Sequence, residues 1–172
     1  MADSDLVEVE LIGVRVELPS NTPIVLLREI DGRRNMSIFI GGPEATAIAF
    51  ALEGVETPRP LTHDLMCDVL AELDARLVRV VVTELRETTF YAELHLRQGE
   101  AERIVSARPS DAIALAARVS CPIFARRDLL ESVGFVEEGV EEEAEEIVAD
   151  PDEVVEEFRS FLDQVNPDDF AS

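Results

Sequence analysis

The apolar run 112–117 (Ala-Ile-Ala-Leu-Ala-Ala) limits the fold more than any other part of this chain. A helix on the surface of a domain needs a polar face, and this run has none, so it predicts a buried helix. The residues before it are Arg108-Pro109-Ser110-Asp111. Pro109 favours an extended conformation for Arg108, which places Arg108 at the end of the preceding strand. We expect Ser110 to be the helix N-cap and Asp111 to lie in the first turn.

The beginning of this buried helix is a candidate site, because an arginine, a hydroxyl and a carboxylate occur there together. The alternative is structural: Ser110 and Asp111 cap the helix, and Arg108 pairs with a surface acid. The residue types alone leave both interpretations open.

Length and composition exclude several classes of protein. A chain of 172 residues suits one domain with a proper core. All 15 basic residues are arginine, which excludes a P-loop lysine and lysine Schiff-base chemistry. The two histidines exclude a three-histidine zinc site, and neither HExxH nor GxSxG occurs. We expect no organic cofactor.

Cysteine usage and hydropathy indicate a cytoplasmic protein. Cys67 and Cys121 are far apart and form no CxxC motif, which is typical of reduced, buried thiols. No apolar run reaches about 18 residues, and the first residues are acidic. The sequence therefore predicts neither a membrane span nor a signal peptide.

The formal net charge of −22 is concentrated in the last part of the chain. Residues 137–172 contain 15 acidic residues and one arginine, whereas residues 1–136 contain 22 acidic residues and 14 arginines. This balance is not typical of a nucleic-acid-binding protein, which must neutralise phosphates. We expect a domain over 1–136, an acidic linker over 137–149 and an amphipathic acidic helix over 150–166.

Alternating and continuous apolar segments predict an α+β fold with a mixed, largely antiparallel sheet and buried, alanine-rich helices. A one-residue change of phase beside Gly13 predicts a β-bulge in the first strand. Strands are expected over 6–18, 24–30, 36–40, 77–85, 90–97, 103–107 and 121–125. Further helices are expected over 43–53, 62–73 and 128–133.

Helix 62–73 is predicted to be amphipathic. His63 and Asp64 fall in its first turn, and we expect both side chains to be exposed. The residues expected to form its buried stripe are Leu65, Met66, Val69, Leu70 and Leu73.

The order of the elements repeats along the chain. Three predicted strands precede the alanine-rich segment 47–52, and three precede the similar segment 112–117, 65 residues later. The pattern suggests an internal duplication of a three-strand-plus-helices unit, although alanine-rich helices also coincide by chance. A duplication would place Glu44 and Asp111 at equivalent helix N-termini.

A second candidate site lies at the start of helix 62–73, where Arg59, His63 and Asp64 occur within six residues. Histidine can transfer protons, and an arginine beside a helix N-terminus can hold a phosphate. The alternative is that His63 and Asp64 are ordinary first-turn surface residues.

Carboxylates supply the candidate metal ligands. Mg²⁺ or Mn²⁺ binds few protein carboxylates and several waters, so a few acids suffice. Glu84 has the same parity as Val80 and Val82 in strand 77–85, and a strand end that reaches solvent is the alternative for it. Spacing alone does not show that any two of the acids meet. The candidate ligands are Glu44, Asp64, Glu84 and Asp111.

Several short motifs occur along the chain in a characteristic order. They are Glu44-Ala45, Ala47-Ile48-Ala49, Arg59-Pro60-Leu61-Thr62-His63-Asp64, Phe90-Tyr91-Ala92 and Arg108-Pro109-Ser110-Asp111-Ala112-Ile113-Ala114-Leu115-Ala116. In this order they resemble the bifunctional nuclease (BFN) domain family, from about Leu6 to Leu130. The resemblance implies an α+β domain with activity against both RNA and DNA.

The residues and the resemblance together predict a cytoplasmic nuclease, a phosphodiesterase whose activity is weak or regulated by the acidic tail. We assign His63 to acid–base catalysis, and Asp64 and Asp111 to metal binding or to orienting His63. The residues assigned to the substrate phosphate are Arg59, Arg108 and Ser110.

The alternative function is a non-catalytic regulatory module. Its acidic helix 151–165 would dock on a protein partner, and the net charge favours this hypothesis. A third hypothesis joins the two, with the acidic tail mimicking nucleic acid over an arginine-lined site. An exposed apolar face would in addition favour a homodimer.

Overall fold

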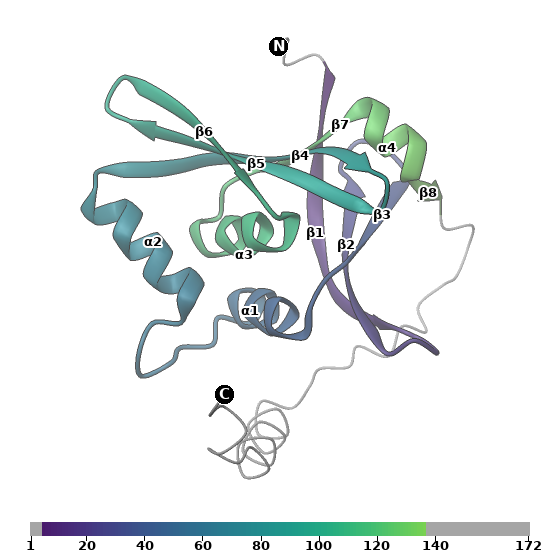
Figure 1. Ribbon diagram of the computed structural model, residues 1–172, viewed down its shortest axis with the longest axis horizontal. Helices are drawn as coiled ribbons and strands as arrows, with labels where there is room; N and C mark the ends of the chain where they lie inside the picture. The colour runs from purple at the N-terminus through teal and green to yellow at the C-terminus, as the bar shows by residue number, and fades with distance from the viewer. Residues whose placement is uncertain (1–4, 137–172) are drawn as a thin grey trace, which may run out of the picture. The chain divides into compact units, whose positions relative to one another are not determined.

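The computed structural model describes residues 5–136, which belong to one compact unit, Met1–Gly139. Within these residues an eight-stranded mixed sheet carries four helices, so the predicted α+β class is confirmed (Figure 1). No helix of this part of the chain is long and apolar enough to cross a bilayer. The predicted acidic linker (137–149) and acidic helix (150–166) lie outside the described residues.

The elements follow the predicted order. The strands are β1 (Leu6–Glu17), β2 (Thr22–Glu29), β3 (Arg34–Phe39), β4 (Ala75–Arg86), β5 (Thr89–Gln98), β6 (Ala101–Ala107), β7 (Ile123–Arg126) and β8 (Phe135–Val136). The helices are α1 (Gly42–Glu53), α2 (Thr62–Glu72), α3 (Pro109–Val119) and α4 (Arg127–Val133).

The strands are joined in the order β6-β5-β4-β7-β1-β2-β3-β8. β4 and β7 run parallel, and the other neighbouring strands of the described sheet are antiparallel. The short strand β7 lies between β4 and β1, so it joins two three-stranded meanders, β1-β2-β3 and β4-β5-β6. β4 is therefore central, as its continuous apolar sequence predicts.

The bulge predicted in the first strand is present. The register of β1 against β2 shifts between Leu11 and Gly13. Gly13 has a φ of 154°, a conformation that residues with a side chain rarely adopt. The extra residue explains why the apolar positions of β1 change parity at this point.

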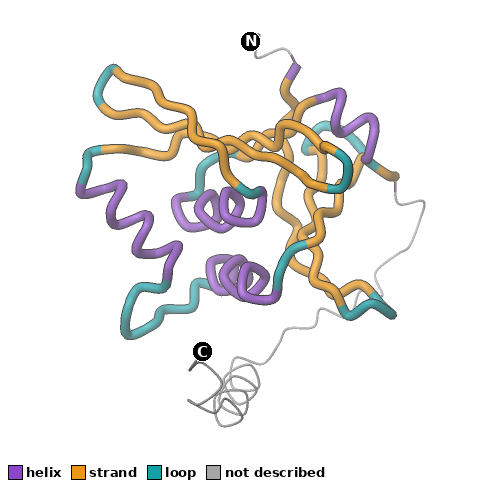
Figure 2. The backbone as a smooth tube through the Cα atoms, in the orientation of Figure 1, coloured by secondary structure: helices purple, strands orange, loops and turns teal. Residues whose placement is uncertain are grey.

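α1 and α3 lie side by side against the sheet (Figures 1 and 2). α3 occupies the centre of the core, since Ala112, Ile113, Ala114 and Leu115 are fully buried and Ala116 is 1% exposed. The prediction that this apolar run forms a buried helix is confirmed.

α2 has the opposite arrangement from the one predicted. Its expected buried stripe is largely exposed, with Leu65 at 52% and Leu73 at 57% exposure. The buried residue of α2 is instead His63, so the predicted exposure of His63 is also wrong. A cavity of about 660 Å³, lined in part by Cys67, Leu70, Leu77, Leu115 and Val119, lies between α2, β4 and α3. Apolar periodicity locates the apolar face of a helix, but not the surface against which the helix packs.

Candidate functional site

Three carboxylates occupy the same place in three helices. Glu44 is the third residue of α1, Asp64 the third of α2 and Asp111 the third of α3. Acids are favourable there because the N-terminus of a helix carries a partial positive charge. Glu44 in α1 and Asp111 in α3 therefore occupy equivalent positions, as the predicted duplication requires. The duplication itself stays a prediction.

The start of α3 differs by one detail from the prediction. The helix begins at Pro109, and Arg108 is its N-cap, with extended backbone angles (φ −69°, ψ 143°). Proline suits the first helical position because its missing N–H would have no partner there. Ser110 therefore falls inside the first turn and is buried, so its prediction as the N-cap is wrong.

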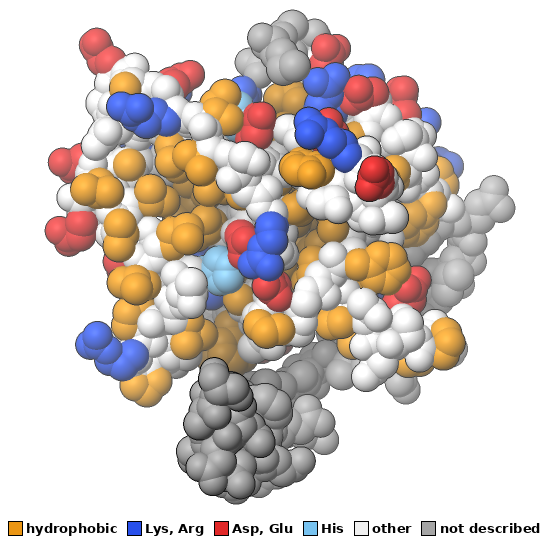
Figure 3. Space-filling view, viewed as in Figure 1, with side chains coloured by type: hydrophobic (Ala, Val, Ile, Leu, Met, Phe, Trp, Pro, Cys, Tyr) orange, Lys and Arg blue, Asp and Glu red, His pale blue; other side chains and the backbone are white. Residues whose placement is uncertain are grey.

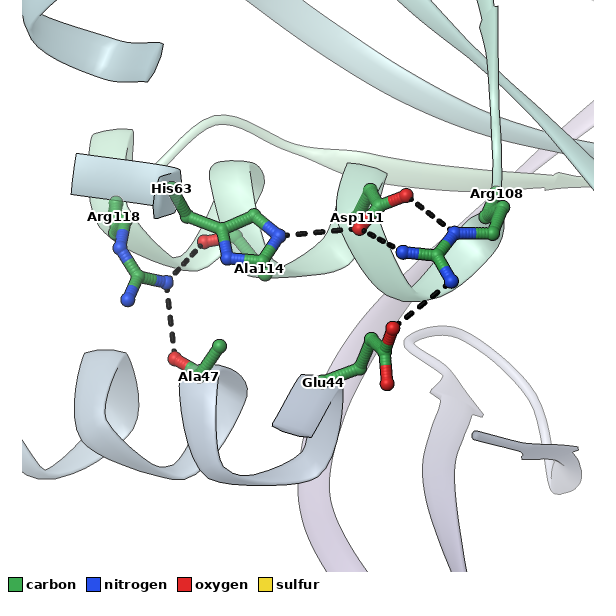
Figure 4. Close-up of polar contacts among 7 residues, drawn as sticks. All are labelled: Glu44, Ala47, His63, Arg108, Asp111, Ala114 and Arg118. Carbon is green, nitrogen blue, oxygen red and sulfur yellow. Dashed lines mark hydrogen bonds and ion pairs between the residues drawn. The ribbon is translucent and has the colours of Figure 1, made fainter. Parts of the chain in front are cut away.

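Arg108 joins the N-termini of α3 and α1 (Figure 4). Its Nε donates to Oδ2 of Asp111 over 2.7 Å, and its Nη2 donates to Oδ1 of the same carboxylate over 2.9 Å. Its Nη1 lies 2.9 Å from Oε1 of Glu44. The Arg108 side chain is nevertheless 64% exposed. The guanidinium thus faces solvent while two carboxylates hold it.

His63 reaches the same carboxylate from α2. Its Nε2 lies 3.2 Å from Oδ1 of Asp111, and only 11% of the His63 side chain is exposed. Because the carboxylate accepts, a neutral imidazole in this position carries its proton on Nε2 and leaves Nδ1 as a proton acceptor. Asp111 thereby links His63 to Arg108.

Arg118 of α3 is a residue of the candidate site that sequence analysis missed. Its Nε donates to Oδ1 of Asp64 over 2.5 Å. Its Nη1 donates to the carbonyl oxygens of Ala47 in α1 and Ala114 in α3, over 3.0 and 2.9 Å. The side chain is 10% exposed. The available sequence signal is an arginine near the end of an otherwise apolar helix.

The Arg118 contacts also position His63. Asp64 follows His63 directly in the first turn of α2, and its Oδ2 accepts the backbone N–H of Leu61 over 2.9 Å. Arg118 therefore ties this turn to α1 and α3 while His63 contacts Asp111. Polar contacts at its N-terminus and the packing of Cys67 against the core attach α2 to its neighbours, while most of its apolar stripe does not take part.

The ion pairs fix the charges of the site. Burial raises the pKa of Asp111, but hydrogen bonds from Arg108 and His63 outweigh burial and hold this pKa below its ordinary value of 3.8. Burial likewise opposes ionisation of Asp64, and the Arg118 hydrogen bond holds the pKa of Asp64 below 3.8. Asp111 and Glu44 raise the pKa of Arg108. The two aspartates are thus ionised at neutral pH.

Three predicted site residues lie outside this network. The Ser110 side chain is buried, and within residues 5–136 no hydrogen bond joins it to His63, Arg108 or Asp111. Glu84 pairs with Arg86 over 2.7 Å, and its side chain is 44% exposed, which agrees with a strand end that reaches solvent. Arg59 is exposed. Within residues 5–136 no hydrogen bond or ion pair joins the Arg59 side chain to His63 or Asp111.

The acids do not form a ready-made metal centre. Among the described residues, no three His, Cys, Asp or Glu side chains gather as metal ligands. Glu44 and Asp111 approach each other, but both bind the Arg108 guanidinium. This donor set does not fit an Mg²⁺ or Mn²⁺ ion, which prefers several free oxygen ligands. A metal role for Glu44, Asp64, Glu84 or Asp111 therefore stays a prediction of the sequence.

Comparison with known proteins identifies the family to which this domain belongs. The model of the bifunctional nuclease domain matches residues 25–138. The chain belongs to the bifunctional nuclease domain family. Two similar proteins come from Mycobacterium tuberculosis, strains CDC 1551 / Oshkosh and ATCC 25618 / H37Rv, and both are described as uncharacterised. Each is 46% identical over 166 residues, which make up 96% of this chain and 98% of the relative.

Family membership confirms the resemblance on the motifs around His63 and Arg108, although the match begins later than Leu6 and extends beyond Leu130. It suggests a nuclease-like function and nucleic-acid binding.

Proposed function

We propose that this bifunctional nuclease domain hydrolyses phosphodiester bonds in RNA and DNA, with His63 as its acid–base residue. The observation that carries the proposal is the contact between His63 and Asp111, 3.2 Å long and largely buried, beside an exposed arginine. A histidine oriented by a carboxylate is a common arrangement for proton transfer near neutral pH.

Within this proposal Asp111 orients the imidazole. Both of its carboxylate oxygens already accept hydrogen bonds, Oδ1 from His63 and Arg108, and Oδ2 from Arg108. That engagement favours the orienting role over the metal-binding role that the sequence left open. Asp64 and Arg118 support the same turn from behind, and within residues 5–136 neither forms a hydrogen bond with Asp111. They act through His63.

Arg108 is the residue that we assign to the substrate phosphate. Its side chain is 64% exposed, so a phosphate oxygen can reach the guanidinium from solvent. A planar guanidinium also matches phosphate geometry. Arg59, which lies outside the network, has no part in this assignment.

Net charge predicts weak binding of substrate. Residues 1–136 hold 22 acidic residues and 14 arginines, and long-range repulsion of nucleic acid follows from that excess. Affinity therefore depends on a few local contacts rather than on a basic surface. Regulation by the acidic tail falls on residues outside the described part of the chain and stays a prediction, as does a cytoplasmic location.

The first prediction tests His63 with a matched control. His95 on β5 forms a similar pair, with its Nε2 3.3 Å from Oε2 of Glu93 and 17% of the side chain exposed. We expect His63→Gln to lower the cleavage rate of RNA and single-stranded DNA oligonucleotides by about 100-fold or more, and His95→Gln to leave it unchanged. The measurement is the initial rate with Mg²⁺, Mn²⁺ or EDTA.

All three proteins are purified identically, so a contaminating nuclease appears equally in each preparation. Equal rates for wild type and His63→Gln would contradict the proposal. The metal and EDTA arms show separately whether cleavage depends on a divalent ion.

A second candidate function is a non-catalytic interaction module. The exposed apolar face of α2 and the acidic surface favour it, because large apolar patches commonly mark binding surfaces. Folded wild-type protein that cleaves neither substrate would support this alternative. Docking of the predicted helix 151–165 on a partner stays a prediction, since that segment lies outside the described residues.

A further inference from the structure

A small cavity lies where the first turn of α2 meets α1 and α3. Its volume is about 300 Å³, at the lower end of the range typical of small-molecule sites. Asp64 and Arg118 lie in its wall, and Glu56 borders it from the loop between α1 and α2. Most of the remaining wall is apolar and includes Phe50, Ala51, Val55 and Leu61.

Arg118 brings free hydrogen-bond donors to this cavity. Its Nε and Nη1 bind Asp64 and two backbone carbonyls, whereas its Nη2 has no hydrogen-bond partner within residues 5–136 (Figure 4). The side chain is nevertheless nine-tenths buried. Among the described residues, no fully buried side-chain nitrogen or oxygen lacks a partner, so Nη2 borders open space, which the cavity supplies. Its two N–H groups are therefore available to a ligand.

The cavity offers more acceptors than donors. Oδ1 of Asp64 accepts from Arg118, and Oδ2 accepts the backbone N–H of Leu61, but each carboxylate oxygen can accept a second hydrogen bond. Glu56 is exposed at the rim. Two acids beside one arginine also disfavour an anionic ligand. A matching ligand is uncharged, carries one acceptor for Nη2 and several donors for the carboxylates, and has apolar faces.

We propose that this cavity binds a guanine base. One edge of guanine carries the O6 acceptor beside the N1–H and N2–H₂ donors, which match Arg118 and the two carboxylates. The other bases have fewer donors beside a carbonyl, so each leaves a polar group of the cavity unpaired. Phe50 and the apolar wall suit the flat faces of a base, since proteins hold unstacked bases against aromatic or apolar side chains.

The cavity lies at a distance from the proposed phosphate contact. Arg108 caps α3 and Arg118 lies in its last turn, ten residues later, which corresponds to a rise of about 15 Å. In Figure 4 His63 lies between the two arginines. Figure 3 shows acidic and basic side chains at the surface beside a histidine, in the middle of this face, so a strand can approach from solvent.

A guanine in the cavity would thus be a few nucleotides away from a phosphate at Arg108. Guanine binding itself does not require cleavage, but its use in selecting the position of cleavage rests on the proposed nuclease function.

The second prediction concerns nucleoside binding to the full chain, measured by isothermal titration calorimetry. We expect guanosine to bind at least about tenfold more tightly than adenosine, cytidine or uridine, because paired hydrogen bonds to a base edge discriminate strongly. Inosine lacks the N2 amino group and should bind about fivefold more weakly than guanosine. Nucleosides are used because they carry no phosphate that could bind Arg108.

Ala51→Leu narrows the cavity and leaves its charged groups in place, because Ala51 is a half-buried residue of the wall on α1. We expect it to weaken guanosine binding about tenfold or more, since the cavity cannot hold both groups. Ala71→Leu is the matched control. Ala71 is exposed on α2 and does not line this cavity, so its variant should bind guanosine as wild type does.

Glu56→Gln tests the same cavity if Ala51→Leu fails to fold, because Glu56 is exposed. It should weaken guanosine binding about threefold or more, since a carboxylate is a stronger acceptor than an amide. Circular dichroism checks that every variant is folded.

Cleavage of single-stranded RNA with one guanine in a run of uridines gives a separate readout. Wild type should cut at a fixed distance from the guanine, and Ala51→Leu should cut without this preference. Guanosine binding without cleavage would contradict the nuclease function and support the guanine site. Absence of guanosine binding, equal binding of all nucleosides, or an affinity that neither Ala51→Leu nor Glu56→Gln changes would overturn the guanine site.

Discussion

α3 and α2 have opposite relations to the core. α3 has an apolar run over 112–117, lies between α1 and the sheet, and has five consecutive residues at most 1% exposed. α2 carries a clear apolar stripe, yet it exposes that stripe and buries His63. A helix segment that is apolar all round must be buried on every side. An amphipathic helix can instead direct its apolar face to another molecule.

Polar residues at both ends of α3 contact the first turn of α2. Asp111 in the first turn of α3 accepts from His63, and Arg118 in the last turn of α3 donates to Asp64. Both ends of α3 therefore hold the first turn of α2 through hydrogen bonds. The comparison shows that polar contacts position His63, the candidate acid–base residue of α2, while the apolar face of α2 stays exposed to solvent.

The third prediction compares the same substitution in the two helices. Leu115→Ala in α3 should lower the free energy of unfolding by about 3 kcal/mol, because Leu115 is fully buried and its truncation leaves a cavity. Leu65→Ala in α2 should change it by less than about 0.5 kcal/mol, since Leu65 is half-exposed. The measurement is urea unfolding.

Both variants are measured at several protein concentrations, so that any contribution of association to the unfolding energy is detected. Equal losses of stability for Leu115→Ala and Leu65→Ala would mean that the apolar face of α2 is part of the core, which would contradict the comparison.

The fourth prediction concerns the attachment of α2. Arg118→Met should lower the free energy of unfolding by about 2 kcal/mol, because it removes a buried charge partner and leaves Asp64 ionised without it. Arg86→Met, which breaks the exposed pair with Glu84, should cost at most about 1 kcal/mol. Urea unfolding of the two variants at pH 7 gives the comparison.

The pH dependence of the Arg118 effect has a definite sign. The pKa of Asp64 lies below its ordinary value of 3.8 in the folded protein. A depressed carboxyl pKa stabilises the fold above the ordinary value, and this stabilisation is lost as the pH falls through the folded value. The difference between wild type and Arg118→Met should therefore be full at pH 7 and shrink below about pH 4. A difference independent of pH would contradict the role of Asp64.

The sequence carries enough information for the elements and for the burial of α3. The run 112–117 has no polar face, and the change of phase beside Gly13 marks the bulge, so both follow from local pattern. The orientation of α2 does not follow from local pattern. The predicted residues do lie along one side of α2. Whether that side faces the core depends on how α1 and α3 pack against the sheet.

The candidate site was only partly predictable for the same reason. The sequence identified four candidate residues by their chemistry alone, and in the structure they lie together: His63, Arg108, Asp111 and Glu44. Arg118 differs, because its partners Asp64 and Ala47 lie 54 and 71 residues away and one of them is a backbone carbonyl. No pattern of spacing in the sequence predicts such a contact.

The most direct test of the central claim, that α3 orients His63 through Asp111, is a double-mutant cycle on the cleavage rate. The variants are His63→Gln, Asp111→Asn and the double variant. Asp128→Asn is the matched control, because Asp128 also lies in a first turn and binds Arg126 through both oxygens, over 3.0 Å each.

If the two residues act as one unit, Asp111→Asn lowers the rate about 10- to 100-fold on its own and has no further effect once His63 is replaced. Asp128→Asn leaves the rate unchanged. Losses that multiply in the double variant, or an Asp111→Asn variant as active as Asp128→Asn, would contradict the account.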